Sequence, residues 1–377
     1  MKSIDALNTP AALIDVPVMT HNIARMQRHL DALDVQFRPH VKTSKCMEIV
    51  RAQLQAGGQG ITVSTLKEAE QFFAAGVTDI LYAVCISGGK LPQALALQRQ
   101  GCKLKITTDS VAGAADIANF GMAHCECFEV WIEIDTDSHR AGVKPDDAAL
   151  LSIANALDNA GATLGGVLTH AGSSYELNTP EALQAIAEQE RAGCVHAAQR
   201  LREAGWRCEG VSVGSTPTAL AARSLDGVTE VRAGVYVFFD LVMLNVGVCG
   251  PGELALSVLT TVIGHQAERG WAIVDAGWMA MSNDRGTSKQ SHDFGLGQVC
   301  TSDGAFLPDY LLTSANQEHG ILSRTGEPDG EITQRFPVGT QLRILPNHAC
   351  ATAAQFPEYQ ALDERGHATT WPRFYGW

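Results

Sequence analysis

The sequence predicts an eight-stranded parallel β/α barrel followed by a β-rich domain. Over about 230 residues, short apolar runs alternate with stretches of helical period, the pattern expected of a parallel barrel. No G-x-G-x-x-G motif follows the first run, which weakens the alternative of an open, doubly wound sheet. Beyond about residue 250 the helical period fades, and glycine-rich loops separate strand-like runs.

Eight apolar runs are the predicted barrel strands. In chain order they are 37–41, 60–64, 80–84, 104–108, 129–134, 165–170, 210–213 and 228–231. Helix signals lie between them. Thr65 and Glu68 form a capping box at the start of one helix, and Gly76 can end it. Thr179 and Pro180 supply an N-cap and a first-turn proline for another helix.

We expect two domains from these patterns, in agreement with the length of 377 residues. The barrel is predicted to occupy 11–245. The β-rich domain is predicted to combine 1–10 with 246–377. Its clearest strands are 254–263, 271–274 and 341–345.

Composition limits the class of partner. The formal net charge of -13 argues against holding nucleic acid by bulk electrostatics. No run approaches the roughly 20 apolar residues of a membrane span, and no basic region with an apolar run opens the chain. The ten cysteines are scattered, which favours reduced core thiols. These observations predict a cytoplasmic enzyme that acts on a small molecule and binds neither a membrane nor nucleic acid.

Polar residues follow the predicted strands, where a β/α barrel places its catalytic groups. They are Lys42 after the first strand, Arg140 after the fifth, His170 after the sixth, Gly214, Ser215 and Thr216 after the seventh, and Arg232, Gly234 and Tyr236 after the eighth. The loops after the last two strands often bind phosphate in barrels, and backbone N–H groups of 214–216 could face an anion. The alternative interpretation of 214–216 is a simple helix N-cap.

Lys42 is the candidate for a Schiff-base lysine, although a lysine at a strand end is more often a surface charge. A Schiff base requires some uncharged amine, hence a depressed pKa. Arg38 and Lys45 lie close in sequence and could repel the proton of Lys42. Lys45 is the rival for the same role. His170, taken alone, is more often a hydrogen-bonded structural histidine.

The chain resembles fold-type III pyridoxal 5′-phosphate enzymes, which have an alanine racemase-like (β/α)8 barrel. The resemblance covers about residues 9–355 and is closest to the D-threonine aldolase and D-serine dehydratase group, on the motif Arg38-Pro39-His40-Val41-Lys42. It implies that Lys42 holds the cofactor and removes the Cα proton. It also implies cofactor contacts for Arg140 (phenolate oxygen), His170 (ring face), Arg232 (pyridine nitrogen), Tyr175 and Tyr236 (near the cofactor), and Ser215, Gly234 and Val235 (phosphate). Gly214 and Thr216 are expected at the phosphate from their position after the seventh strand.

A histidine and a cysteine end a predicted strand near the C-terminus, at His348 and Cys350. Two ligand-type residues at i and i+2 of an extended segment point to the same side. Imidazole and thiolate suit zinc, and manganese or another divalent metal is an alternative. By itself the pair is more often structural. The resemblance strengthens the metal interpretation, because dehydratases of the group carry His-x-Cys here and aldolases carry His-x-Asp.

The resulting hypothesis is a metal-dependent dehydratase of a D-3-hydroxy amino acid, such as D-serine or D-threo-3-hydroxyaspartate, which yields a 2-oxo acid and ammonia. The alternative is aldol cleavage of the Cα–Cβ bond to glycine and an aldehyde. Arginine at 232 counts mildly against the aldolase, because many aldolases of the group lack it. A racemase and a non-catalytic pyridoxal phosphate-binding protein rank lower. The resemblance further implies a homodimer.

Overall fold

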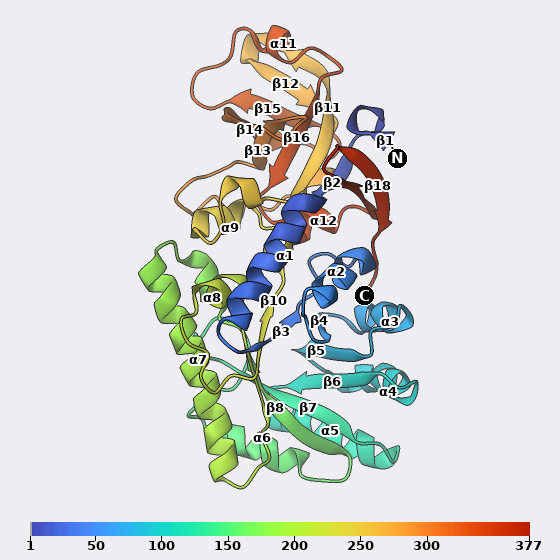
Figure 1. Ribbon diagram of the computed structural model, residues 1–377, viewed down its shortest axis with the longest axis vertical. Coiled ribbons are helices and arrows are strands. Elements are labelled where there is room, and N and C mark those ends of the chain that lie inside the picture. The colour runs from blue at the N-terminus through green and yellow to red at the C-terminus, as the bar shows by residue number, and fades with distance from the viewer. Residues whose placement is uncertain (1) are drawn as a thin grey trace. The chain divides into compact units, whose positions relative to one another are not determined.

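The computed structural model describes residues 2–377 and separates into two compact units (Figure 1). The barrel unit comprises 24–234 and 374–377, and the β unit comprises the residues up to Ile23 together with 235–373. The division falls within helix α1 (Val16–Asp31) and directly after strand β10 (Glu230–Ala233). The domain limits expected from the sequence, 11–245 for the barrel and 1–10 with 246–377 for the β-rich domain, remain a prediction.

The barrel unit contains eight parallel strands, which confirms the predicted fold class. Along the sheet the order is β3-β10-β9-β8-β7-β6-β5-β4, and a parallel bridge between His40 and Thr62 links the two ends. Each predicted run overlaps one strand. The strands are β3 (Gln36–Pro39), β4 (Ile61–Val63), β5 (Asp79–Cys85), β6 (Lys103–Thr108), β7 (Phe128–Ile134), β8 (Ala162–Thr169), β9 (Gly210–Val213) and β10.

Helices connect successive strands of the barrel. They are α2 (Met47–Gln55), α3 (Leu66–Ala74), α4 (Leu91–Arg99), α5 (Val111–Ala123), α6 (Ala149–Leu157), α7 (Pro180–Glu203) and α8 (Thr216–Ala221), with short 3-10 helices η2 (Gly88–Lys90) and η3 (Gly172–Glu176). The N-cap predicted at Thr65 forms, because its hydroxyl accepts the Glu68 N–H at 3.0 Å. The Glu68 carboxylate accepts the N–H of Ser64, one residue before the cap, at 2.9 Å.

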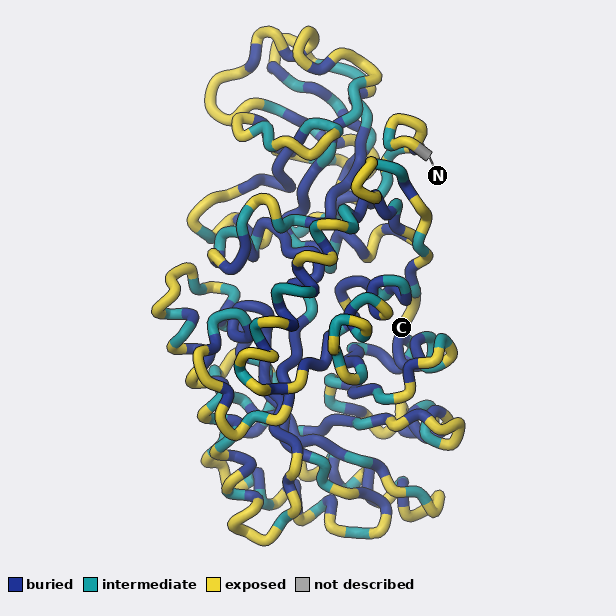
Figure 2. Tube along the Cα trace, viewed as in Figure 1, coloured by how far each residue is buried: buried dark blue, intermediate teal, exposed yellow. Residues whose placement is uncertain are grey.

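The interior of the barrel is filled by side chains. Leu81, Trp131 and Leu168 form one cluster there, and each is at least 96% buried. Figure 2 shows buried backbone along β7 and β8, whereas the outer turns of α7 are exposed. The barrel is therefore a packed core, and chemistry must take place at the ends of its strands.

The β unit is one ten-stranded sheet in the order β1-β18-β17-β2-β11-β12-β15-β14-β13-β16, closed by a pairing of β11 with β16. Its strands are β1 (Lys2–Ser3), β2 (Ala11–Asp15), β11 (Leu256–Gln266), β12 (Trp271–Val274), β13 (Gly297–Thr301), β14 (Phe306–Ala315), β15 (Gly320–Arg324), β16 (Gln341–Pro346), β17 (Glu358–Leu362) and β18 (His367–Pro372). Strand β2 pairs antiparallel with β11 and parallel with β17.

The β unit also contains the short helices α9 (Leu241–Val246), α10 (Trp278–Met281), α11 (Ile332–Arg335) and α12 (Ala349–Ala353). The 3-10 helices of the unit are η1 (Ile4–Ala6), η4 (Val235–Val237), η5 (Pro251–Glu253) and η6 (Ala267–Arg269). Within residues 2–377, no helix is both long and apolar enough to cross a bilayer.

Candidate functional site

Lys42 lies in the turn that follows strand β3, as the sequence predicts. The turn is anchored by Val41, which donates its N–H to the Thr62 carbonyl at 2.9 Å, and by Lys45, which donates to the Val41 carbonyl at 2.9 Å. Burial, followed by the charge of Lys42, holds the pKa of His40 well below its ordinary value. The ammonium group is therefore within electrostatic reach of that imidazole.

Two basic residues expected to repel the proton of Lys42 are instead neutralised. Arg38 Nε donates to Glu230 Oε2 at 2.8 Å, and its Nη1 lies 3.0 Å from Asp79 Oδ1. Lys45 Nζ lies 3.0 Å from Oε1 of the buried Glu68. Arg38 and Lys45 therefore each have a carboxylate partner of their own, which offsets the positive charge that the sequence placed beside Lys42.

His170 follows strand β8 and carries an uncharged imidazole at neutral pH. Burial, then the charges of Lys42, Arg140 and Arg232, lower its pKa to about 3. Its Nδ1 lies 3.1 Å from the Gly214 carbonyl, which can only accept, so Nδ1 carries the proton and Nε2 is bare. The Tyr175 ring, in η3, lies 6.1 Å from the His170 ring between centroids.

Arg232, on strand β10, is buried within the barrel unit. Its Nε donates to Ser212 Oγ at 2.8 Å, and its Nη2 donates to the Thr169 carbonyl. Ser212 Oγ in turn donates to Glu230 Oε1 at 2.8 Å. Burial lowers the pKa of the guanidinium, and the charge of Glu230 opposes that effect. Arg232 is thus a fixed cation whose orientation depends on Ser212 and Glu230.

Arg140 has a more exposed side chain, in the loop after strand β7. Its Nη2 lies 3.3 Å from Oε1 of the buried Glu133, and the side chain is 57% exposed. Oε2 of Glu133 accepts from the Cys85 thiol at 3.3 Å. The structure therefore brings Lys42, Arg140, His170 and Arg232 together at one end of the barrel.

The segment Gly214-Ser215-Thr216 forms a tight turn into α8. Gly214 has a φ of +127°, which favours glycine. Ser215 caps the helix, since its hydroxyl accepts the Thr218 N–H at 3.2 Å and its own N–H donates to Thr218 Oγ1 at 2.9 Å. The Ser215 N–H is therefore bonded within the cap. It does not face an anion, in contrast to the expectation from the sequence for this group.

Gly234 and the two residues after it follow the end of strand β10. A Cβ on Gly234 would lie 2.9 Å from the His40 carbonyl oxygen and 3.2 Å from Thr43 Oγ1, so only glycine allows this approach to the Lys42 turn. Val235 and Tyr236 begin the β unit, in η4, and both are buried.

His348 and Cys350 converge in the β unit, although not by the geometry expected. Strand β16 ends at Pro346, His348 is the extended N-cap of α12, and Cys350 is already helical. The prediction of an extended i, i+2 pair is therefore wrong. The helical turn nevertheless joins the two side chains by a hydrogen bond between Cys350 and His348.

A buried frame supports this pair. His348 Nδ1 lies 3.0 Å from Asp284 Oδ2, so the carboxylate orients the ring and leaves Nε2 for a metal. Asp240 accepts the Ala349 N–H at 2.9 Å and fixes the start of α12. Asn347 donates to the Asp284 and Gly295 carbonyls at 3.0 and 2.8 Å. Sequence reasoning missed Asp284 and Asp240, since nothing in the pattern links them to a segment more than sixty residues away.

The pair offers one nitrogen and one sulfur donor, a set that zinc accepts readily. Within residues 2–377, no cluster of three or more His, Cys, Asp or Glu side chains could hold a metal ion. The remaining coordination positions would therefore fall to water or substrate, an arrangement typical of catalytic metals.

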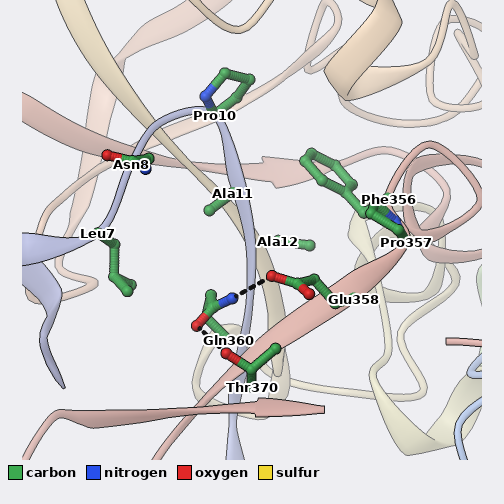
Figure 3. Close-up of a pocket in the computed structure, with 10 residues that line it drawn as sticks. All are labelled: Leu7, Asn8, Pro10, Ala11, Ala12, Phe356, Pro357, Glu358, Gln360 and Thr370. Carbon is green, nitrogen blue, oxygen red and sulfur yellow. Dashed lines mark hydrogen bonds between the residues drawn. The ribbon is translucent and has the colours of Figure 1, made fainter. Parts of the chain in front are cut away.

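A separate surface pocket lies in the β unit and contains none of these residues (Figure 3). Its volume is about 270 Å³, and it lies beside the N-terminal segment and strands β17 and β18. Gln360 crosses its floor, donating to Glu358 at 3.0 Å and accepting from Thr370 at 3.1 Å. Glu358 is the one titratable residue among those that line the pocket, so the lining offers no second group to complete an acid–base pair.

Comparison with known proteins accounts for both units. Residues 14–242 match the family described as alanine racemase, N-terminal domain, and residues 255–362 match a putative serine dehydratase domain. The D-threo-3-hydroxyaspartate dehydratase of Delftia sp. (strain HT23) is 66% identical over 98% of both chains. The D-serine dehydratase of Dictyostelium discoideum is 29% identical over 96% of this chain and 94% of its own.

Solved structures show the same similarity to D-threo-3-hydroxyaspartate dehydratase. A cysteine-to-alanine mutant of D-threo-3-hydroxyaspartate dehydratase, described as the metal-free form, is 65% identical with a TM-score of 0.99 over 100% of both chains. D-threonine aldolase from Filomicrobium marinum is 24% identical, with a TM-score of 0.81 over 98% of this chain and 95% of its own. At this identity, the similarity to the Filomicrobium marinum structure shows the fold alone.

Proposed function

The chain belongs to the family of D-threo-3-hydroxyaspartate dehydratase, built on an alanine racemase N-terminal domain, and from this premise we propose a specific activity. The protein is a dehydratase of D-3-hydroxy amino acids, with D-threo-3-hydroxyaspartate or D-serine as substrate. It uses pyridoxal 5′-phosphate in the barrel unit and a divalent metal in the β unit. The products are a 2-oxo acid and ammonia.

The environment of Lys42 is the observation that supports this proposal most. Its rival, Lys45, is bound to the buried Glu68 and also lies over the Trp377 ring, 5.7 Å from its centroid. The described residues include no such carboxylate for Lys42. The uncharged ring of His170 and the fixed cation of Arg232 lie near it instead. An amine in this setting fits the aldehyde of the cofactor.

The surrounding residues also fit a phosphorylated pyridine. Nδ1 of His40 is buried and has no hydrogen-bond partner within the described residues, so one nitrogen of this imidazole is left for a bound group. Gly234 has no side chain, so the backbone after strand β10 packs directly against the Lys42 turn.

Pyridoxal phosphate, when bound, supplies an aldehyde that captures amines and a ring that draws electrons from the adjacent carbon. Lys42 would hold the aldehyde and would later move the proton at the substrate Cα. Arg232 has only donors, so it would contact the ring nitrogen without taking a proton from it. His170 would cover the ring face, and Arg140 would neutralise the phenolate oxygen.

A divalent metal, when bound, supplies a Lewis acid that helps a hydroxyl group to leave. His348 would bind it through Nε2 and Cys350 through Sγ, while Asp284 keeps the imidazole in the required orientation. A neutral pyridine ring withdraws electrons weakly, so assistance at the leaving group is the chemistry that this chain needs. This argument favours dehydration over aldol cleavage.

The decisive experiment is incubation of the holoenzyme with D-threo-3-hydroxyaspartate, D-serine and D-threonine. Release of a 2-oxo acid with ammonia supports the proposal, whereas glycine with an aldehyde would identify an aldolase. Lys42→Ala should remove the visible absorbance of lysine-bound cofactor and prevent its trapping by borohydride. Lys45→Met is the matched control and should retain both signals.

Three narrower expectations accompany this function. We expect a homodimer, which light scattering would test. We expect zinc or manganese at His348 and Cys350, which elemental analysis of purified protein would identify. We also expect a cytoplasmic location, which fractionation of the source cells would test.

A further inference from the structure

Glu190 is a buried carboxylate that the proposed mechanism does not use. It lies on helix α7, where the residue is only 2% exposed. The apolar face of the same helix, including Ile186, Ala187 and Cys194, is also buried, so the helix backbone is firmly placed. A carboxylate at such a position is costly unless several donors satisfy it.

Three donors from two loops meet this carboxylate. Oε1 accepts the Ala171 N–H at 2.8 Å. The Thr218 side chain and the Gly214 backbone N–H lie beside it and favour its charged form. Ala171 follows strand β8, whereas Gly214 and Thr218 belong to the turn after strand β9 and the first turn of α8. Glu190 is therefore the point at which the two loops share one partner.

These loops carry the groups assigned above to the cofactor. Ala171 is the neighbour of His170, and Gly214 is the neighbour of Ser215. Direct contacts complete the arrangement, because His170 Nδ1 lies 3.1 Å from the Gly214 carbonyl and Ser174 Oγ lies 2.9 Å from Ser215 Oγ. Ser174 Oγ also donates to the Ala171 carbonyl at 2.7 Å. Thr218 contacts both Ser215 and Glu190 and so completes a ring of contacts among these residues.

We propose that Glu190 is a positioning residue that sets the spacing between the His170 imidazole and the Ser215 turn. This role rests on the proposed function, since it concerns the ring face and the phosphate of pyridoxal phosphate. The carboxylate touches neither group itself. It acts by holding the backbone of Ala171 and Gly214, so that the aromatic ring and the phosphate of one rigid molecule are accommodated together.

The chemistry of the carboxylate agrees with this role. Burial raises its pKa to about 7, and the hydrogen bonds from Ala171, Thr218 and Gly214 work in the opposite direction. Above pH 8 the group is therefore mostly ionised and can accept all three bonds. Alanine would remove every acceptor and leave two buried N–H groups unsatisfied. Glutamine would keep the shape but replace one acceptor oxygen by a donor.

The test compares the affinity of the apoprotein for pyridoxal phosphate with its affinity for pyridoxal, which has the same aldehyde and ring without phosphate. Spectral titration at pH 8.5 gives both dissociation constants. Positioning requires that Glu190→Ala lower the preference for the phosphorylated compound by about tenfold or more, and that Glu190→Gln lower it by about threefold or more. Glu181→Ala, an exposed site on the same helix, is the matched control and should change it by less than twofold.

A purely structural role would lower both affinities by the same factor, because it would only reduce the folded fraction. An unchanged preference in folded Glu190→Ala overturns the proposal, as does an unchanged preference in Glu190→Gln if the alanine variant does not fold. Faster hydrogen exchange at Ala171 and Gly214 in the Glu190→Gln apoprotein is expected independently of any cofactor. If the wild-type protein binds neither compound through a lysine, the proposed function fails instead, and the exchange result still decides the role of Glu190 in the loops.

Discussion

Glu230→Gln should destabilise the barrel strongly, because this carboxylate stands between two buried arginines. Its Oε2 pairs with Arg38 at 2.8 Å, and its Oε1 accepts from Ser212, which holds Arg232. The Arg38 and Glu230 side chains are only 6% and 7% exposed. Burial lowers the pKa of Arg38, yet the charges of Glu230 and Asp79 outweigh that effect and raise it.

The magnitude follows from this burial. Glutamine removes the negative charge and presents an amide N–H₂ to either the Arg38 donor or the Ser212 hydroxyl. Breaking a buried pair by changing one partner costs about 3–5 kcal/mol. Asp79 remains as a second partner of Arg38, so we expect a loss near the lower end, roughly 3 kcal/mol.

Urea unfolding of the apoprotein, followed by tryptophan fluorescence, measures this loss. Glu209→Gln is the matched control, because its pair with Arg207 has side chains that are 84% and 68% exposed. The control should change the free energy of unfolding by less than about 0.5 kcal/mol. A loss below about 1 kcal/mol in Glu230→Gln, with an unchanged slope, would refute the reasoning.

Three further predictions address the two sites. Gly234→Ala should push the Lys42 turn aside, since the new Cβ would meet the His40 carbonyl, and should weaken pyridoxal phosphate binding by about tenfold in spectral titration. Asp284→Asn should lower metal affinity by about 10–100-fold in competition with a chelator, because it weakens the partner that orients His348, and an unchanged affinity would exclude that support. Burial raises the pKa of Glu190 from 4.5 to about 7, so its stabilising contribution is complete below pH 4.5 and is lost as the pH rises through 7. The free energy of unfolding of Glu190→Gln, relative to wild type, should therefore rise by up to roughly 3 kcal/mol between pH 4.5 and 8. A difference that does not change with pH would contradict the shift.

Periodic patterns made the barrel predictable from sequence. Each strand is short, apolar and followed by a turn or cap signal, so local chemistry was sufficient to locate all eight. The strand-end residues Lys42, His170 and Arg232 followed, because a parallel barrel brings the same ends together. These residues converge because of the strand topology, so their convergence can be predicted without knowledge of any single contact.

The supporting residues could not be predicted in the same way. Asp79 and Glu230 neutralise Arg38 across 41 and 192 positions of sequence, and Glu190 reaches Ala171 across 19. Nothing local distinguishes these carboxylates from solvated ones. The extended geometry expected at His348 and Cys350 failed for a related reason. The hydrogen bond from Ala349 to the distant Asp240 starts a helix where the local pattern favoured a strand.

The position of strand β2 bears on how the chain can be assembled during synthesis. This strand is made near the start of translation, yet its partners β11 and β17 emerge only after about 240 and 345 further residues have been added. The barrel strands pair mostly with sequence neighbours, so a nearly finished barrel can form outside the ribosome while β2 is still unpaired. Residues 11–15 are therefore exposed to chaperones that bind β segments during the synthesis of the whole barrel.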